Sequence, residues 1–298
     1  MGVEYRSVDD PDDVGQRIDN FLLRILKGVP KSKIYRVLRT GQVRVNGGRV
    51  KPTYKLDQGD QVRIPPITVR QSAPIAFQDA TAAQIEASIL YEDQRFIGLN
   101  KPAGFAVHGG SSISAGIIEI LRIVRDDPRL ELAHRLDKDT SGCLLICKKR
   151  SVLAAAQAAF RERKVKKHYH LIVHGSWPKQ AKTVQLRLKR YSTEWGERRV
   201  RVDGLGQTAR TDFEILASKE RATQLRASLH TGRTHQIRVH AQSQGCPLVG
   251  DSKYGVKDDQ AARLCLHAER LIVPTQYGGL ELNAPLDKRM EQIWSELS

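Results

Sequence analysis

The sequence reads HRLDKDTSG at residues 134–142 and continues directly into the apolar run CLLIC at residues 143–147. The first nine residues hold two acids, three bases, two hydroxyls and a glycine, whereas the run that follows predicts a buried strand. Polar groups at the end of a core strand are where functional sites tend to form. The alternative is an ordinary turn, because Asp137, Thr140 and Ser141 can satisfy backbone groups close to them.

The segments on either side of this run predict a mixture of strands and helices. The predicted strands cover residues 88–99 (two strands around Glu92 and Asp93), 142–147, 169–173, 210–216 and 223–230, and the predicted helices cover residues 114–124, 151–163 and 235–244. Thr234 is the expected cap of the last helix, and Gly245 with Pro247 behind it supplies a stop signal. The order has no strict strand–helix–strand rhythm, so the fold class is α+β.

Basic residues are concentrated near the start of the chain. Residues 14–70 hold 13 Lys and Arg against three acidic residues, which is more than half of the formal net charge of +16. Apolar spacing predicts two short helices there, and Val43 to Val45 and Val62 to Ile64 predict small strands. Residues 71–88 lack Lys and Arg and are rich in Ala, Ser and Gln, which indicates a linker. Residues 89–298 then form a second, larger domain.

Composition indicates a soluble protein that binds a polyanion, most simply nucleic acid. No apolar run approaches the roughly 18 residues of a membrane span, and the acidic N-terminus lacks the apolar core of a signal peptide. Four cysteines without a C-x-x-C pair do not make a disulfide framework. We therefore expect a cytoplasmic protein with reduced thiols and no membrane partner, and a monomer is the default expectation.

The histidines and acids do not predict a metal site. His230, His235 and His240 recur every five residues, a spacing that places them on no single helical face. A metal-dependent nuclease would need clustered acids, and Asp137 with Asp139 supplies one such pair. We expect neither a metal nor any other cofactor.

Residues 134–142 fill every specified position of H-R-L-D-x-x-T-S-G and so resemble that motif of the pseudouridine synthases that modify ribosomal and transfer RNA. Further segments resemble family motifs in family order: LNKPAG at 99–104, Lys167-His168-Tyr169, and TGRTHQIRVH at 231–240. Residues 14–70 are similar to the S4 RNA-binding domain, through RIDNFL at 17–22, GQVRVNG at 41–47 and GDQV at 59–62. The chain looks most like members that act on large-subunit (23S) ribosomal RNA, although residues 245–255 depart from their pattern.

This resemblance implies an S4-like domain over residues 14–70 and a mixed, mostly antiparallel catalytic domain over residues 89–298. It implies an isomerase that turns uridine into pseudouridine without a cofactor. The substrate would be large-subunit ribosomal RNA, free or in an assembling particle. Transfer RNA and a catalytically silent S4-type assembly factor are the alternatives.

The resemblance also assigns roles to single residues. Asp137 would be the essential carboxylate, which attacks the ribose or removes a sugar proton, and Arg238 would pair with it. Tyr169 would pack against the target base, and Arg135 would fill the space that this base leaves on flipping out. The expected RNA contacts of the S4-like domain are Lys31, Lys33, Arg36, Arg39 and Arg44. His134 is expected to be structural, and Lys101 and His108 to lie near the cleft with no assigned role.

Overall fold

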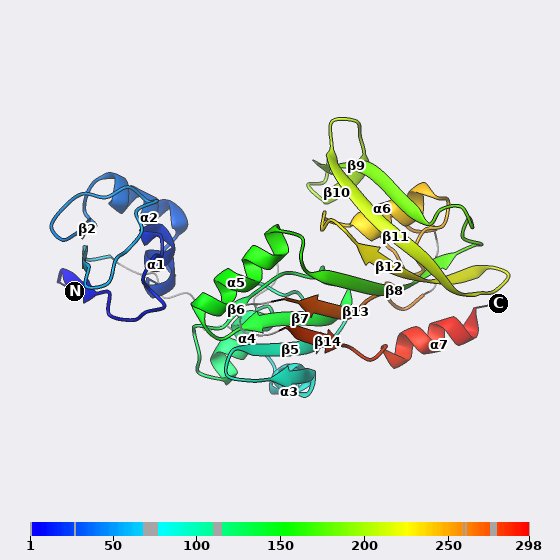
Figure 1. Cartoon of the computed structure of the whole chain (residues 1–298), viewed down its shortest axis with the longest axis horizontal. Coiled ribbons are helices and arrows are strands. Elements are labelled where there is room, and N and C mark those ends of the chain that lie inside the picture. The colour runs from blue at the N-terminus through cyan, green and yellow to red at the C-terminus, as the bar shows by residue number, and fades with distance from the viewer. Residues whose placement is uncertain are drawn as a thin grey trace. The chain divides into compact units, whose positions relative to one another are not determined.

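The computed structural model describes residues 2–26, 28–67, 77–109, 115–257, 259, 261–274 and 279–297. The chain divides into two compact units, Met1–Ala76 and Phe77–Ser298 (Figure 1). Of the segment predicted as a linker, residues 71–76 lie outside the described part. Residues beyond them form helix α3 (Asp79–Ala87), which packs against α4 (Ile117–Val124) and so belongs to the large unit. Alanine is the strongest helix former, which explains why an Ala-rich segment became helical.

The small unit packs two helices against a three-stranded antiparallel sheet. The helices are α1 (Ile18–Ile25) and α2 (Lys31–Arg39), and the strands β1 (Glu4–Ser7), β2 (Arg44–Val45) and β3 (Gln61–Ile64) lie in the order β1-β3-β2. Ile18, Phe21 and Leu22 recur at helical spacing and are buried in one core. The expected small α+β domain is confirmed, and β1 precedes its predicted start at residue 14.

The large unit is built on one mixed sheet. Within the described residues its strands lie in the order β10-β9-β11-β12-β8-β13-β7-β5-β4, with β14 paired to β13 and β6 paired to β7. The strands are β4 (Ile89–Glu92), β5 (Phe96–Lys101), β6 (Glu131–Leu132), β7 (Ser141–Cys147), β8 (Lys166–His174), β9 (Thr183–Ser192), β10 (Arg198–Val202), β11 (Gln207–Ser218), β12 (Ala222–Leu229), β13 (Leu266–Val273) and β14 (Leu280–Asn283). Only β7 and β13 pair in parallel among these, so the expected mixed, mostly antiparallel sheet is confirmed.

Strand β7 is buried along its whole length, as its apolar sequence predicts. Gly142 near its start has φ of +107°, and a Cβ placed there would lie 2.2 Å from the backbone oxygen of Ala268 on β13. A side chain at residue 142 would therefore push β13 away from β7. The glycine that ends the polar motif is thus what allows the parallel pairing.

Helices cover this sheet and divide its core. Helices α4 and α5 (Arg150–Arg161) pack on the half around β5 and β7, and α6 (Gln236–Ser243) packs on β9, β10 and β11 (Figure 1). Helix α7 (Lys288–Glu296) packs near the chain's end through Met290 and Ile293. The start of β7, strand β8 and the start of α6 carry the residues that the motifs singled out.

Candidate active site and basic surface

The loop that carries Asp137 joins β6 to β7 and is fastened to β7 by the residues before it. The backbone N–H of Ala133 donates to the carbonyl of Leu145 at 2.9 Å, and the Leu145 N–H donates to Nε2 of His134 at 3.1 Å. Burial lowers the pKa of His134 to about 4, so its ring is neutral and free to accept this bond. The ring also stacks on Phe160, with centroids 5.0 Å apart. His134 therefore supports the loop from within.

The backbone of Asp137 forms a turn, but its side chain does not take part. Thr140 N–H donates to the Asp137 carbonyl at 3.2 Å, which accounts for the turn that the sequence allowed. No hydrogen bond to the Asp137 carboxylate is found in the described part of the chain, and the side chain is 29% exposed. Nε2 of His235 lies 3.9 Å from its Oδ2 atom. The turn thus explains the backbone and leaves the carboxylate available for chemistry.

Lys101, at the end of β5, stabilises the Asp137 loop through hydrogen bonds to backbone carbonyls. Its side chain is fully buried, and its ammonium donates to the carbonyls of Pro102, Phe105 and Lys138 at 2.9, 2.8 and 2.9 Å. Burial lowers its pKa to about 7, while the carboxylates of Asp139 and Asp137 oppose that shift. Because Lys138 directly follows Asp137, this lysine helps to set the position of the carboxylate.

Tyr169 on β8 lies close enough to Asp137 for the carboxylate charge to affect the pKa of its hydroxyl. The ring packs against both the core around β5 and β7 and the core around β8 and β12. Burial raises the pKa of its hydroxyl, and the negative charge of Asp137 adds to the rise. The phenol is therefore protonated at neutral pH.

The segment before α6 is held by a buried amide. Gln236 accepts from the Thr231 hydroxyl and the Arg233 N–H through Oε1, at 2.8 and 3.0 Å, and donates through Nε2 to the Arg210 carbonyl and the Thr211 hydroxyl, both at 2.9 Å. The predicted cap, Thr234, is displaced by one residue. His235 precedes the helix in the left-handed conformation, with φ of +52°, and makes no side-chain capping bond.

Arg238 forms its ion pair with Asp251, which corrects the expected direct pairing with Asp137. Its Nε and one terminal nitrogen donate to the two Asp251 oxygens at 2.8 and 2.5 Å, and the side chains are 3% and 1% exposed. Burial lowers the pKa of Arg238, but the ion pair with Asp251 raises it by more, and the charge of Asp137 adds to that rise. The pKa of Arg238 therefore lies above its usual value. Arg238 thus lies near enough for the charge of Asp137 to raise its pKa, while its hydrogen bonds go to Asp251.

Arg135 is exposed beside this site. No ion pair of its side chain is found among the described residues. The alternative role for Arg135, a salt bridge near Asp139, is therefore not observed there. This exposed side chain, two residues before Asp137 in the chain, is accessible to a ligand.

Asp251, Tyr254 and the contact of His235 with Asp137 were not predicted from the sequence. Asp251 and Tyr254 lie in residues 245–255, which the sequence marked only as a departure from relatives. In the structure, the backbone N–H groups of Lys253 and Tyr254 both donate to the Asp251 carboxylate at 2.9 Å. Such a loop fixes a carboxylate for a buried guanidinium.

The basic residues predicted on the small unit are all exposed. Lys31, Lys33, Arg36 and Arg39 lie on α2, and Arg44 lies on β2 with its guanidinium 3.3 Å from the carbonyls of Gly41 and Gly47. No acidic partner of these five is found among the described residues. They form a surface of uncompensated positive charge.

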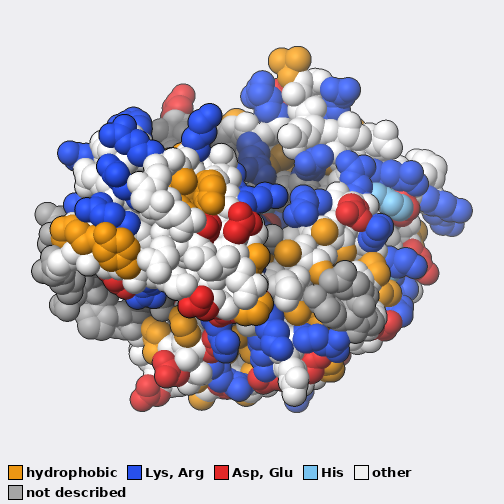
Figure 2. All heavy atoms as spheres, turned by 60° about the vertical axis from the view of Figure 1, so that its left-hand side comes forward, with side chains coloured by type: hydrophobic (Ala, Val, Ile, Leu, Met, Phe, Trp, Pro, Cys, Tyr) orange, Lys and Arg blue, Asp and Glu red, His pale blue; other side chains and the backbone are white. Residues whose placement is uncertain are grey.

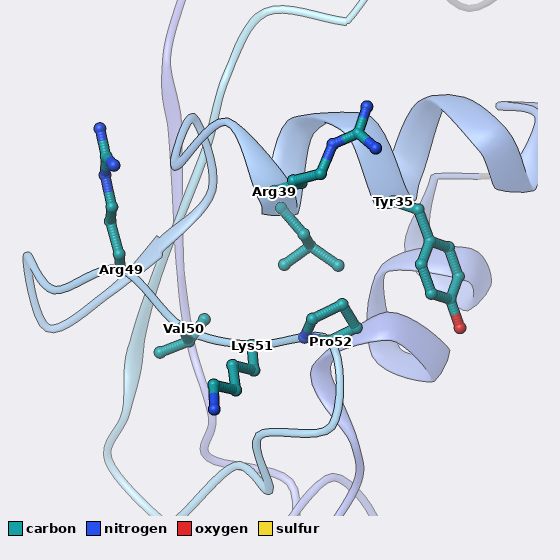
Figure 3. A pocket seen from close by; sticks show the side chains of 7 residues that line it. Tyr35, Arg39, Arg49, Val50, Lys51 and Pro52 are labelled. Atoms are coloured by element: carbon teal, nitrogen blue, oxygen red, sulfur yellow. The ribbon is translucent and has the colours of Figure 1, made fainter.

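A hollow of about 470 Å³ adjoins this surface (Figure 3). Arg39 and Tyr35 from α2 lie on one side, and Arg49, Val50, Lys51 and Pro52 from the following segment lie on the other. Cations at the rim with an apolar floor suit a nucleotide, whose phosphate is charged and whose base is flat and apolar.

A second hollow of about 310 Å³ lies in the large unit between β9, β10 and the start of α6. Lys189, Arg190 and Arg233 line it together with Leu205. Two of its lining residues, Arg233 and Thr234, directly precede His235, whose Nε2 atom lies 3.9 Å from Oδ2 of Asp137. Lys and Arg side chains spread widely over the face of the molecule in Figure 2.

Within the described ranges, no group of three or more His, Cys, Asp and Glu side chains is placed to hold a metal ion. No described helix has the length and apolar character needed to cross a membrane.

Two family models match the chain. The model described as RNA pseudouridylate synthase matches residues 95–243, and the S4 domain model matches residues 16–62. The first match contains Asp137, Tyr169 and Arg238, and the second contains the basic residues of α2 and β2.

Curated relatives extend the similarity to nearly the whole chain. The chain is 50% identical to "Ribosomal large subunit pseudouridine synthase C" of Pasteurella multocida, over 96% of this chain and 91% of that protein. It is 49% identical to the protein of the same name from Haemophilus influenzae, over 96% and 92%.

Among solved structures, the chain is similar to "Human RNA Pseudouridylate Synthase Domain Containing 4". The TM-score is 0.60 and the identity 25%, over 72% of this chain and 94% of that one. "Human RNA Pseudouridylate Synthase Domain Containing 1" has a TM-score of 0.57 and 29% identity, over 67% and 83%.

Proposed function

The chain belongs to the RNA pseudouridylate synthase family and is a pseudouridine synthase, an intramolecular isomerase, and we propose that its substrate is large-subunit (23S) ribosomal RNA. Support comes from relatives of that name at about half identity over nearly the full length. The formal net charge of +16 and the S4 domain suit a large polyanionic partner. Such a substrate implies that the protein works in the cytoplasm.

The isomerisation needs no redox partner and releases no second product. The bond from N1 of uracil to C1′ of ribose breaks, the base turns, and a bond from C5 to C1′ forms, while the C5 proton leaves and N1 gains one. A carboxylate can attack C1′ or remove a sugar proton to start this sequence, and it must be ionised for either step. The chain therefore needs one available carboxylate in a rigid site.

Asp137 is that carboxylate, and its availability carries the proposal. Its oxygens are free of hydrogen bonds from the described residues, while the backbone around it is fixed by Thr140, Lys101 and the start of β7. A fixed backbone with a free side chain is the arrangement expected of a reacting group, because the site holds its geometry before the substrate arrives.

Tyr169 and Arg238 act beside Asp137 in this proposal. The Tyr169 ring offers a flat surface for the uracil, and its protonated hydroxyl can donate a hydrogen bond. Arg238 supplies a positive charge near Asp137, from a position that Asp251 fixes.

Arg135 stabilises the opened RNA in this proposal. The target uridine must leave its stack before C1′ and C5 can be reached, and unstacking costs a few kcal/mol. The exposed guanidinium of Arg135 can occupy the vacated space and contact nearby phosphates.

The S4 unit supplies affinity in this proposal. Phosphate contacts by Lys31, Lys33, Arg36, Arg39 and Arg44 are independent of base sequence and would hold the RNA. The hollow beside Arg39 offers a place for one unpaired nucleotide.

The test is pseudouridine mapping of unmodified large-subunit transcript by carbodiimide labelling and primer extension. Stops that appear with the wild type and not with Asp137→Asn would establish the reaction, the carboxylate and the target uridines. Asp139→Asn, two residues away, is the matched control and should retain the stops. If the wild type gives no stops on this transcript, on pre-ribosomal particles or on transfer RNA, the proposal fails. Stops on transfer RNA alone would overturn the substrate only.

A further inference from the structure

His235 and Tyr254 connect the Asp137 carboxylate to the edge strand β10. Tyr254 Oη lies 2.7 Å from Nδ1 of His235, and Nε2 of the same imidazole lies 3.9 Å from Oδ2 of Asp137. We propose that His235 is a positioning residue that donates its Nε2–H to Asp137, with Tyr254 fixing the tautomer that makes this donation possible. This inference rests on the proposed role of Asp137.

The tautomer follows from the hydrogen bonds of Tyr254. Its hydroxyl oxygen already accepts the backbone N–H of Val200 at 2.8 Å. The hydroxyl hydrogen then needs an acceptor, and within the described residues the atom placed to take it is Nδ1 of His235. A neutral imidazole that accepts at Nδ1 carries its hydrogen at Nε2, which is the nitrogen that faces Asp137.

The imidazole is neutral in this setting. Burial lowers the pKa of His235, Arg238 and Lys253 lower it further, and Asp137 and Asp251 oppose them. A neutral ring with a fixed Nε2–H is a hydrogen-bond donor to a carboxylate and does not compete with it for a proton.

The ring is also held in place by its backbone and by packing. His235 adopts φ of +52°, a left-handed conformation that the bonds of Gln236 to Arg233 stabilise on either side. The imidazole packs edge-on to the Tyr254 ring, with centroids 5.5 Å apart and planes at 68°. The Arg238 guanidinium lies over the same Tyr254 ring at 5.1 Å. The backbone of His235, the Tyr254 ring and the Arg238 guanidinium that packs on this ring therefore together hold Nε2 of His235 near Asp137.

Donation to Oδ2 would leave the other carboxylate oxygen to face the ribose. At 3.9 Å the contact is longer than a hydrogen bond, as catalytic contacts often are before the substrate closes the site. The expected consequence of its loss is a slower chemical step with little change in RNA affinity, because His235 itself is only 11% exposed.

Two substitutions separate the ends of the imidazole. The amide of Gln in His235→Gln reaches the Nε2 position and can still donate to Asp137, whereas the shorter amide of His235→Asn reaches the Nδ1 position and can bond only Tyr254. Asn tolerates the left-handed conformation better than Gln does. A merely structural role for His235 would therefore make Asn the better replacement, and the proposed role makes Gln the better one.

The experiment measures single-turnover rates on a large-subunit transcript labelled with tritium at C5 of uridine, since that hydrogen is released when C5 joins the ribose. Filter binding gives the Kd of each variant, and thermal unfolding reports its folding. We expect His235→Asn and His235→Leu to be slower than wild type by about 10- to 100-fold. Their Kd should stay within about twofold, and His235→Gln should recover most of the rate.

Tyr254→Phe provides an independent check through a double-mutant cycle. It should slow the wild type, in which it frees the imidazole to change tautomer, but it should not slow His235→Gln, which has no tautomer to fix. Equal rates for the Asn and Gln variants, or a normal rate for His235→Leu, would overturn the inference while an inactive Asp137→Asn kept the proposed function intact. An active Asp137→Asn would instead remove the function on which the inference rests.

Discussion

Arg238 and Asp251 form a buried two-pronged ion pair that joins the first turn of α6 to the segment after residue 250. The pair orients a guanidinium that lies near Asp137, and Asp251 in turn accepts hydrogen bonds from the N–H groups of Lys253 and Tyr254. One carboxylate therefore sets both the cation of the site and the residue that fixes the tautomer of His235.

Asp251→Asn should destabilise the protein by about 3 to 5 kcal/mol, because it leaves a guanidinium buried without a counter-charge. Urea unfolding at pH 7 measures this loss. Glu281→Gln is the control: Glu281 pairs with Arg270 at 2.9 Å, but both side chains are more than 40% exposed. Its cost should stay below about 1 kcal/mol. Similar losses for the two variants would contradict the importance of burial at Arg238.

Lys101→Met should destabilise the Asp137 loop. Methionine has nearly the length of lysine but no donor, so the carbonyls of Pro102, Phe105 and Lys138 would lose a shared partner. Unpaired buried acceptors cost about 1 to 3 kcal/mol each, and we expect a total loss of about 3 kcal/mol with a slower single-turnover rate. Lys164→Met, at a side chain 63% exposed, should change neither quantity. An unaltered melting temperature for Lys101→Met would show that the loop holds itself.

Glu119 on α4 should give the protein a pH-dependent contribution to stability. Its Oε2 atom accepts the N–H groups of Gly109 and Gly116, both at 2.9 Å, and His108 approaches its other oxygen at 3.4 Å. Burial would raise the pKa of Glu119, but these bonds lower it from 4.5 to about 2. A lowered folded-state pKa adds stability above pH 4.5 that is lost as the pH falls from 4.5 towards 2.

Glu119→Gln should therefore reduce the free energy of unfolding by about 2 kcal/mol at pH 7, discounted for a side chain 22% exposed. The difference from wild type should shrink between pH 4.5 and pH 3. Urea unfolding at pH 7, 4.5 and 3 measures it. A difference that stayed constant down to pH 3 would rule out the lowered pKa.

Local sequence pattern was enough for much of the fold. The apolar run of β7, the alternation around β8 and the helical spacing of α1, α2 and α5 each lie within one segment, so they can be predicted without knowing what packs against them. Strands β9 and β10 escaped because Lys and Arg fill their solvent faces and mask the alternation of Leu186, Leu188 and Val200.

The site was predictable only where its chemistry is local. Asp137 and Arg135 belong to one continuous motif, whereas Arg238 meets Asp251 across 13 residues and His235 meets Tyr254 across 19. These pairings depend on how the segment after α6 folds back, which no spacing in the sequence specifies. The resemblance predicted that Arg238 pairs with Asp137, whereas in the structure Arg238 donates its hydrogen bonds to Asp251.

The S4 unit offers a test of how RNA is held. Lys33, Arg36 and Arg39 lie on α2 at spacings of three residues, all exposed and without acidic partners in the described part of the chain. Each phosphate contact that they make releases counterions from the RNA, so the logarithm of affinity falls with the logarithm of salt concentration.

Replacing all three by Gln should reduce that slope by about 2 to 3, since each lost contact removes about 0.7 to 0.9. The measurement is Kd for unmodified large-subunit transcript between low and moderate salt. The control replaces Lys179, Lys288 and Arg289, three exposed cations of the large unit, and changes the net charge equally. If the control lowered the slope as much as the α2 variant, general charge and not the α2 surface would account for binding. Because the substituted residues lie in the S4 unit, the single-turnover rate at saturating enzyme should stay near that of wild type.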